Sequence, residues 1–132
     1  MILVDTSALI EFYRPTGDVQ ARAAVAAAIA EGEVAVNGIV QVEILAFART
    51  DDDRRKLAAD LKAFHRLELS AAEFDLASDL GFRLRRNGVT VPATDLIIAA
   101  SALLADATLY HLDAHFDAIA EHSDLRARRL GL

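Results

Sequence analysis

The stretch that decides the fold is MILVDTSALI, residues 1–10. Residues 2–4 form a short apolar run with two β-branched side chains, which is typical of a strand buried on both faces. Asp5 ends that run. The hydroxyls of Thr6 and Ser7 then offer a cap for a helix that follows. A buried strand that passes through an acid directly into a helix predicts one unit of an α/β fold.

The rest of the chain alternates between short apolar runs and longer helical patterns. Strands are predicted for residues 34–36, 67–69, 108–112 and 125–130. Further helices are predicted for residues 18–30, 39–49, 51–65, 71–86, 95–104 and 116–121. Asn37 is expected to cap one helix, and Ser70 with Glu73 makes a capping box for another. This alternation predicts a parallel sheet with helices on both faces.

In such a sheet, ligands bind at the carboxyl ends of the strands, near a switch in strand order. Asp5 and Asp113 each directly follow a predicted strand. Both are therefore expected to emerge on the same edge of the sheet.

Composition favours one domain spanning residues 1–132, long enough to bury its own core. The 54% hydrophobic content excludes a disordered chain. No apolar stretch approaches the ~20 residues that span a bilayer, and the N-terminus lacks the basic-then-apolar order of a signal peptide. We therefore expect a cytoplasmic protein. The absence of Cys excludes disulfides, thiolate zinc sites and a Cys nucleophile.

The net charge of −6 argues against a protein that coats nucleic acid, although it leaves a nuclease open. Two arginine clusters could contact phosphates or could simply be solvated surface. They are Arg83, Arg85 and Arg86, and Arg126, Arg128 and Arg129.

Four acids stand in apolar surroundings where a carboxylate is costly to bury. They are Asp5, Glu43, Asp95 and Asp113. Their separations of 38, 52 and 18 residues fit no local motif, so only the fold could bring them together. Converging carboxylates need a cation to hold them, and hard oxygen ligands suit Mg²⁺ or Mn²⁺. The sequence therefore predicts a metal site built from these four residues.

Each acid also has a structural interpretation. Asp5 and Asp113 could cap turns or helices, and Asp95 could complement a helix dipole. Glu43 could lie at the edge of an apolar stripe and extend to water. Asp117 follows on the helix after Asp113 and is expected to face solvent.

Other chemistries have weaker support. His111 and His115 are four residues apart, but they straddle a strand end and lack the Glu of a zinc-protease helix. Ser7 lacks the glycine-flanked elbow of a serine nucleophile. No phosphate-binding glycine loop is present.

At these residues the chain resembles the PIN-domain ribonucleases, and most closely the VapC toxins of type II toxin–antitoxin modules. The resemblance rests on DTSALI at residues 5–10, Glu43 in an apolar helix, DLIIAA at 95–100 and HLDAHF at 111–116. It implies a three-layer α/β/α fold and a Mg²⁺- or Mn²⁺-dependent endoribonuclease whose metal pocket is lined by Asp5, Glu43, Asp95 and Asp113. It also implies a homodimer and an antitoxin partner that inserts a segment into the acidic pocket.

The chain departs from this family pattern at three positions, one of them near Asn37, where a Ser or Thr is common. His111 stands where a Thr or Ser is common, and His115 stands where a second Asp is common. The expected reaction is hydrolysis of RNA by metal-activated water, which leaves a 5′-phosphate and a 3′-hydroxyl. The alternatives are a catalytically inactive module of the same fold that binds RNA or protein, and a phosphohydrolase of small molecules.

Overall fold

The structure, a computed structural model, describes residues 1–131. In this range the strands are β1 Ile2–Val4, β2 Val34–Val36, β3 His65–Arg66, β4 Thr108–His111 and β5 Ala127–Arg129. The helices of the same range are α1 Thr6–Tyr13, α2 Val19–Ala30, α3 Gly38–Phe47, α4 Asp51–Ala63, α5 Ala71–Arg86, α6 Ala93–Leu104 and α7 Ala114–Glu121.

Across residues 1–131, five parallel strands form one sheet in the order β3-β2-β1-β4-β5. The first strand of the chain therefore lies in the middle, with Leu3 paired to Ala35 of β2 on one side and to Leu109 of β4 on the other. The chain runs outward from β1 to β3, then crosses back to β4. This reversal makes the carboxyl end of β1 the switch point of the sheet.

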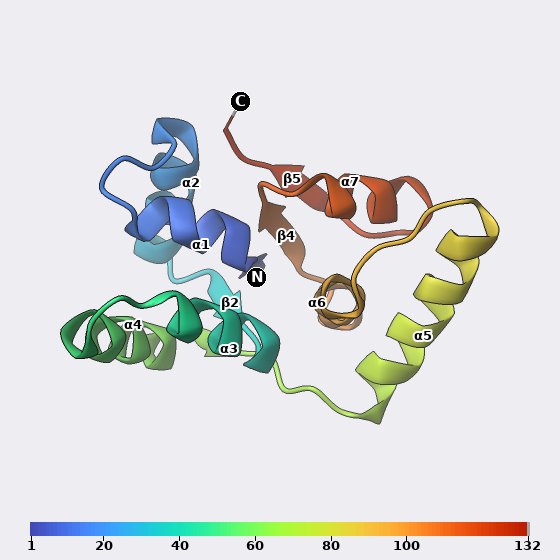
Figure 1. The fold of residues 1–132 in the computed structure, drawn as a ribbon, viewed down its shortest axis with the longest axis horizontal. Helices are drawn as coiled ribbons and strands as arrows, with labels where there is room; N and C mark the ends of the chain where they lie inside the picture. Colours follow the sequence, from blue (N-terminus) through green and yellow to red (C-terminus); the bar gives the residue numbers. More distant parts are fainter. Residues whose placement is uncertain (132) are drawn as a thin grey trace.

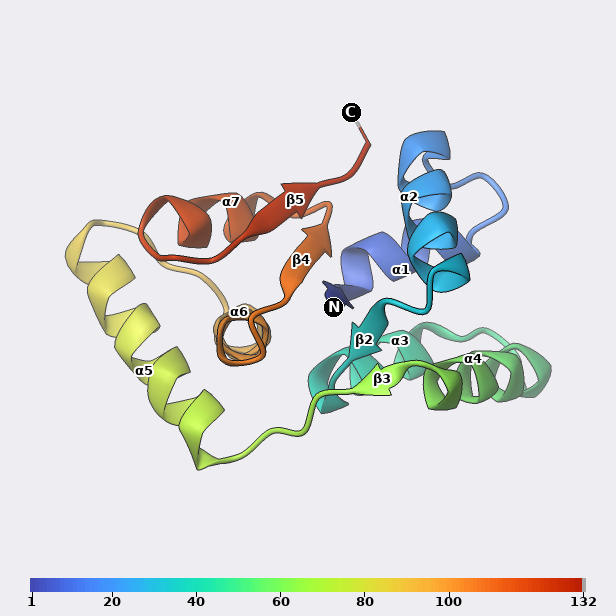
Figure 2. The same ribbon diagram turned by 180° about the vertical axis from the view of Figure 1, so that it is seen from behind.

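Helices cover both faces of the sheet, as predicted. Figures 1 and 2 show α1 to α4 on one side of the strands and α5 to α7 on the other. Helices cover both faces of the central strands, and Leu3, Val4 and Leu109 are fully buried. The sequences of these strands are therefore mostly apolar, without the alternation of a half-exposed strand. The α/β fold with a central parallel sheet is thus confirmed.

One predicted strand is wrong in position. The strand expected at residues 67–69 is instead the two-residue β3, and the helix expected to reach residue 65 ends at Ala63. This strand lies at the sheet edge, and both of its residues are exposed. Its place is set by pairing with β2, His65 beside Ala35 and Arg66 beside Val36. Hydrophobic pattern carries no signal for an edge strand of this kind.

The helix caps follow the predicted pattern with one exception. Asn37 caps α3 through a bond from the Val40 amide, and Glu73 accepts bonds from the Ser70 amide and hydroxyl. At α1, however, the cap is Asp5 and not a hydroxyl of the residues that follow it. Among residues 1–131, no helix is long and apolar enough to cross a membrane.

Candidate active site

Asp5 lies at the switch point of the sheet. It directly follows β1, and its backbone amide donates to the Tyr110 carbonyl of the neighbouring β4. Its side chain caps α1, because Oδ2 accepts bonds from the Ser7 amide at 3.1 Å and the Ser7 hydroxyl at 2.6 Å. The same hydroxyl accepts a bond from the Leu112 amide at 3.0 Å. Ser7 therefore ties Asp5 to the loop that leaves β4.

Glu43 reaches this edge from α3. Its helix packs Val40 and Ile44 into the core, while Glu43 itself is half-buried. The Thr6 hydroxyl of α1 donates to the Glu43 carboxylate at 2.8 Å. Two consecutive hydroxyls thus orient two different acids of the candidate site, one directly after β1 and one on α3.

Asp95 lies in the first turn of α6, the helix that returns to the sheet from the opposite face. Its side chain is 12% exposed. A carboxylate in the first turn is stabilised by the unpaired amides and the positive end of the helix dipole. The start of α6 therefore delivers a nearly buried acid to the carboxyl edge of the sheet.

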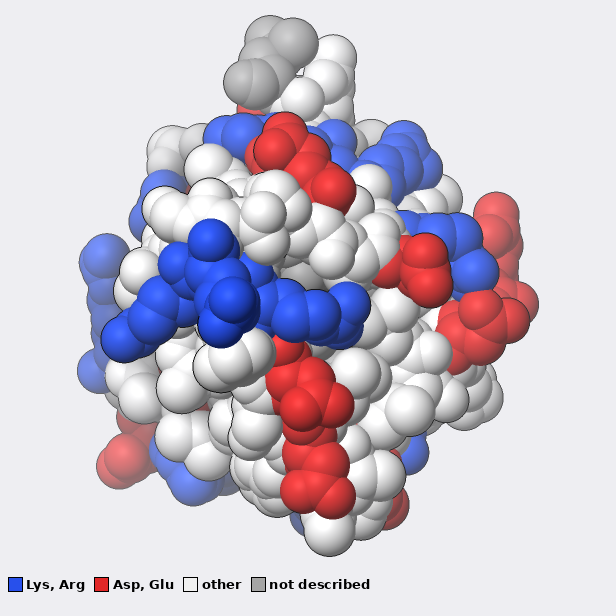
Figure 3. All heavy atoms as spheres, turned by 90° about the vertical axis from the view of Figure 1, so that its right-hand side faces the viewer, with Lys and Arg blue, Asp and Glu red and all other residues white. Residues whose placement is uncertain are grey.

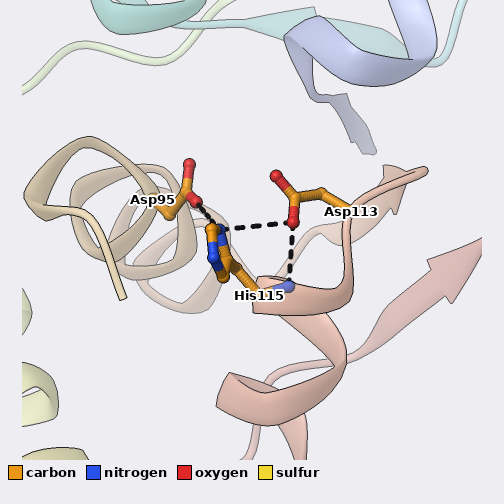
Figure 4. Close-up of side chains that lie close together, drawn as sticks. All are labelled: Asp95, Asp113 and His115. Atoms are coloured by element: carbon orange, nitrogen blue, oxygen red, sulfur yellow. Dashed lines mark hydrogen bonds and ion pairs between the residues drawn. The ribbon is translucent and has the colours of Figure 1, made fainter. Parts of the chain in front are cut away.

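Asp113 caps α7 immediately after β4. Its Oδ1 accepts a bond from the His115 amide at 2.9 Å. Figure 4 shows the His115 ring between the two carboxylates, with Asp95 on one side and Asp113 on the other. The ring Nδ1 is 2.9 Å from Asp95 Oδ2 and 3.3 Å from Asp113 Oδ1. One ligand atom from each of these three residues lies within 4.8 Å of the others.

When no cation is bound, burial and mutual repulsion disfavour the ionised form of two carboxyl groups at this edge, those of Asp5 and Asp95. Burial raises the pKa of Asp5 to about 6, and the charge of Asp95 adds to this effect. Burial also raises the pKa of Asp95, opposed by the His115 hydrogen bond and reinforced by the charges of Asp113 and Glu43. The four acids are therefore close enough for their charges to interact.

His111 supports this site without facing it. Its ring is fully buried in β4, and burial lowers its pKa. Nδ1 accepts a bond from the Asp113 amide at 3.1 Å, so the ring hydrogen of the neutral form lies on Nε2. That nitrogen faces Asp117 Oδ1 at 3.5 Å, and Asp117 also pairs with Arg129 at 2.7 Å. Asp117 therefore contacts a side chain of β4 and a side chain of β5.

The arrangement suits a small divalent cation. The available donors are carboxylate oxygens and one imidazole nitrogen, and Asp5 and Asp95 are costly to ionise unless a positive charge neutralises them. Of the four acids predicted from sequence, Asp95 and Asp113 come together with His115, whereas Asp5 and Glu43 lie outside that group of three and interact with Asp95 through their charges. Sequence reasoning did not expect His115 beside Asp95. The only signal for it was its position in the first turn of the helix that Asp113 caps.

The first arginine cluster ends α5, and the second lies in and just before β5. Arg83, Arg85 and Arg86 occupy the last turn of α5, where cations complement the helix dipole. Figure 3, which views the molecule from the side of α5, shows a band of basic atoms above a stripe of acidic ones. In the second cluster, Arg126 pairs with Asp106 at 2.8 Å. Contacts within the chain therefore hold much of the second cluster.

The comparisons with known proteins agree with this architecture. The family model described as PIN domain matches residues 2–122. The chain therefore belongs to the PIN-domain family.

One individual relative gives a more specific similarity than the family model does. Ribonuclease VapC11 of Mycobacterium tuberculosis is 34% identical over 131 residues, which cover 96% of this chain and 97% of the relative. The resemblance to VapC ribonucleases is thus confirmed.

Solved structures share the fold. The crystal structure of VapBC2 from Rickettsia felis, bound to a DNA fragment from its promoter, superposes with a TM-score of 0.78 at 19% identity over 98% of this chain and 99% of that one. Mycobacterium tuberculosis VapC20, described as a toxin that cleaves the sarcin-ricin loop, gives a TM-score of 0.70 at 18% identity over 96% and 99%.

Proposed function

We propose that this chain is the ribonuclease toxin of a VapBC-type toxin–antitoxin module and hydrolyses RNA with the help of Mg²⁺ or Mn²⁺. The observation that carries the proposal is the meeting of Asp95, Asp113 and His115 within 4.8 Å, beside the buried Asp5, at the switch point of a PIN-domain sheet. The membership of the PIN family and the identity to a VapC ribonuclease support the reaction class.

The proposed metal ligands are Asp5, Glu43, Asp95 and Asp113. A bound divalent cation supplies Lewis-acid chemistry, because it acidifies water and neutralises charge that develops on phosphate oxygens. The protein contributes orientation: the Ser7 hydroxyl holds Asp5 and the Thr6 hydroxyl holds Glu43. One of the carboxylates accepts the proton of the attacking water. Attack by water leaves a 5′-phosphate and a 3′-hydroxyl.

The proposed partners follow from the same family. RNA is the substrate, in the cytoplasm. We propose a cognate antitoxin as the protein partner, since one structural relative is a toxin–antitoxin complex from Klebsiella pneumoniae. The acidic edge offers a site for a basic side chain of that antitoxin, which would occupy the place of the metal. A homodimer of this chain is also proposed.

Cleavage of a mixed RNA pool tests the reaction. The purified chain is incubated with Mg²⁺, Mn²⁺ or EDTA, and the ends of any products are identified. Asp95→Asn should reduce the rate by roughly 10²–10⁴-fold, because it removes a charged ligand and a candidate proton acceptor. It should leave the circular dichroism spectrum unchanged. Asp75→Asn, which removes the same charge from an exposed position on α5, is the matched control.

Two results would count against the proposal. Cleavage that persists in EDTA, or a near-normal rate in Asp95→Asn, would place the chemistry elsewhere. Retained metal binding with no cleavage of any RNA offered, including total cellular RNA, would favour a binding module of the same fold.

A further inference from the structure

His115 occupies a position that the proposed reaction does not yet use. It lies in the first turn of α7, and its backbone amide is fixed to Asp113 by the 2.9 Å hydrogen bond that caps the helix. The side chain turns back toward the sheet edge, so that Nδ1 meets Asp95 from α6 and Asp113 from its own cap. Figure 4 shows this ring reaching from α7 toward α6. The side chain is 44% exposed, so burial in the core does not account for its position.

The spacing of the three groups matches that of ligands on one ion. Two atoms each ~2.1 Å from a cation are about 3.0 Å apart at adjacent corners of an octahedron and about 3.4 Å apart in a tetrahedron. Nδ1 lies 2.9 Å from one carboxylate oxygen and 3.3 Å from the other. Both contacts of Nδ1 therefore have the length expected between ligands of one ion, and the three ligand atoms lie within 4.8 Å of one another. A neutral imidazole presents the Nδ1 lone pair once its hydrogen is on Nε2.

We propose that His115 is a nitrogen ligand of the metal centre, completing a site with Asp95 and Asp113, and that it directs the site toward Mn²⁺ and later transition metals over Mg²⁺. This inference rests on the proposed metal-dependent function. Imidazole suits the transition metals, whereas Mg²⁺ strongly favours oxygen ligands. A histidine at this position thus changes which ion the same carboxylates hold best.

The other described histidines cannot supply this nitrogen without rearrangement. His111 is fully buried and accepts the Asp113 amide at Nδ1. His65 lies on the edge strand β3, where Nε2 is 2.9 Å from the Gly32 carbonyl. His122 is exposed at the far end of α7. If a histidine nitrogen is bonded to the metal, substitution of His115 alone should therefore remove it.

Pulsed electron paramagnetic resonance of the full chain loaded with Mn²⁺ tests the proposal without reference to RNA cleavage. The spectrum should contain the modulation of a directly bonded imidazole nitrogen, and it should change when the protein is labelled with ¹⁵N-histidine. His115→Asp should bind Mn²⁺ without that nitrogen signal, and His122→Gln should retain it. Calorimetry on the same proteins should show the ratio of Mn²⁺ to Mg²⁺ affinity falling by roughly 10-fold in His115→Asp. His115→Gln, whose spectrum should also lack the signal, guards against an effect peculiar to the added charge.

The outcomes separate the two proposals. If wild-type protein binds Mn²⁺ with no coupled nitrogen, or if His115→Asp leaves the affinity ratio unchanged, His115 is not a ligand and the acidic metal site stands without it. Loss of the nitrogen signal in His122→Gln would also overturn the assignment. If folded wild-type protein binds neither ion, the metal site itself is absent and the proposed function falls with it.

Discussion

At the scale of single residues, the three consecutive positions after β1 have different roles in the candidate site: one is an acid, and the other two orient acids. Asp5 is 4% exposed and is held by Ser7. Thr6, between them, donates instead to Glu43 on another helix. Asp5 therefore caps α1 and belongs to the acidic edge at the same time. The structural and the functional interpretation of this residue are compatible.

The buried Asp5 should make the metal-free protein less stable as pH rises. Burial raises its pKa from the ordinary 3.8 to about 6, so the native state holds a proton that the unfolded chain has lost between about pH 4 and 6. Stability should fall through that window and stay low above it. The shift corresponds to roughly 3 kcal/mol as an upper bound. Asp5→Asn should flatten this dependence and raise the free energy of unfolding at pH 8, with little effect at pH 4.

Urea denaturation in EDTA at pH 4, 6 and 8 measures this effect. Asn can still accept the Ser7 amide bond, so the cap of α1 should survive the substitution. Asp75→Asn again controls for the change in net charge. A loss of stability in Asp5→Asn at pH 8 would show that ionised Asp5 is stabilising and that burial does not dominate its behaviour.

At the scale of elements, helix starts supply three of the four acids at this edge: Asp5, Asp95 and Asp113. Helices α1, α3 and α7 each begin directly after a strand at this edge, capped by Asp5, Asn37 and Asp113. Helix α6 brings Asp95 in its own first turn. Unpaired amides at helix starts favour negative charge, so this one edge can collect carboxylates that would be costly elsewhere. The Asn37 Nδ2 group is buried there with no hydrogen-bond partner among residues 1–131.

The turn between α1 and α2 should tolerate no side chain at Gly17. A Cβ atom there would lie 1.8 Å from the Glu11 carbonyl oxygen, which is backbone and cannot move aside alone. Gly17→Ala should therefore cost more than about 2 kcal/mol of unfolding free energy. Gly32→Ala is the matched comparison: its φ is +70° and nothing lies within 4 Å of the added carbon, so strain of about 1 kcal/mol is expected. Equal costs in urea denaturation would contradict this description of the turn.

At the scale of the whole molecule, the sheet order concentrates distant parts of the chain at one point. Because β1 lies between β2 and β4, the residues after β1 and β4 meet, as the bond from the Leu112 amide to Ser7 shows across 105 positions. The crossover through α5 and α6 then returns Asp95 to the same edge from the opposite face of the sheet. A ligand bound there would connect elements from both helical layers.

Metal binding should therefore stabilise the whole fold. Mn²⁺ at about 100 times its dissociation constant adds roughly 2.7 kcal/mol to the unfolding free energy, which for a chain of this size corresponds to a rise in Tm of about 10 °C. Differential scanning calorimetry with and without Mn²⁺, at fixed pH, measures the shift. Asp95→Asn should lose most of it, and Asp75→Asn should keep it. An equal shift in both variants would indicate that the ion binds elsewhere.

The sequence alone determined the architecture because local patterns carried it. The runs at residues 2–4, 34–36 and 108–112 predicted the central strands, since strands buried on both faces leave no polar alternation. The cap residues Asn37 and Ser70 marked helix starts correctly. The edge strand was misplaced because β3 is defined by pairing with β2 and not by its own exposed side chains.

The sequence also selected four acids, because carboxylates in apolar runs are costly without a partner. Their role as metal ligands stays a prediction. Only the tertiary structure decided how they are arranged: that Thr6 serves Glu43, that Ser7 joins Asp5 to Leu112, and that His115 lies between Asp95 and Asp113. The physical reason is that the contacts to Glu43, Leu112 and Asp95 span 37, 105 and 20 positions and depend on how the sheet and helices pack. No local pattern encodes these contacts, because sheet order and helix packing fix them together.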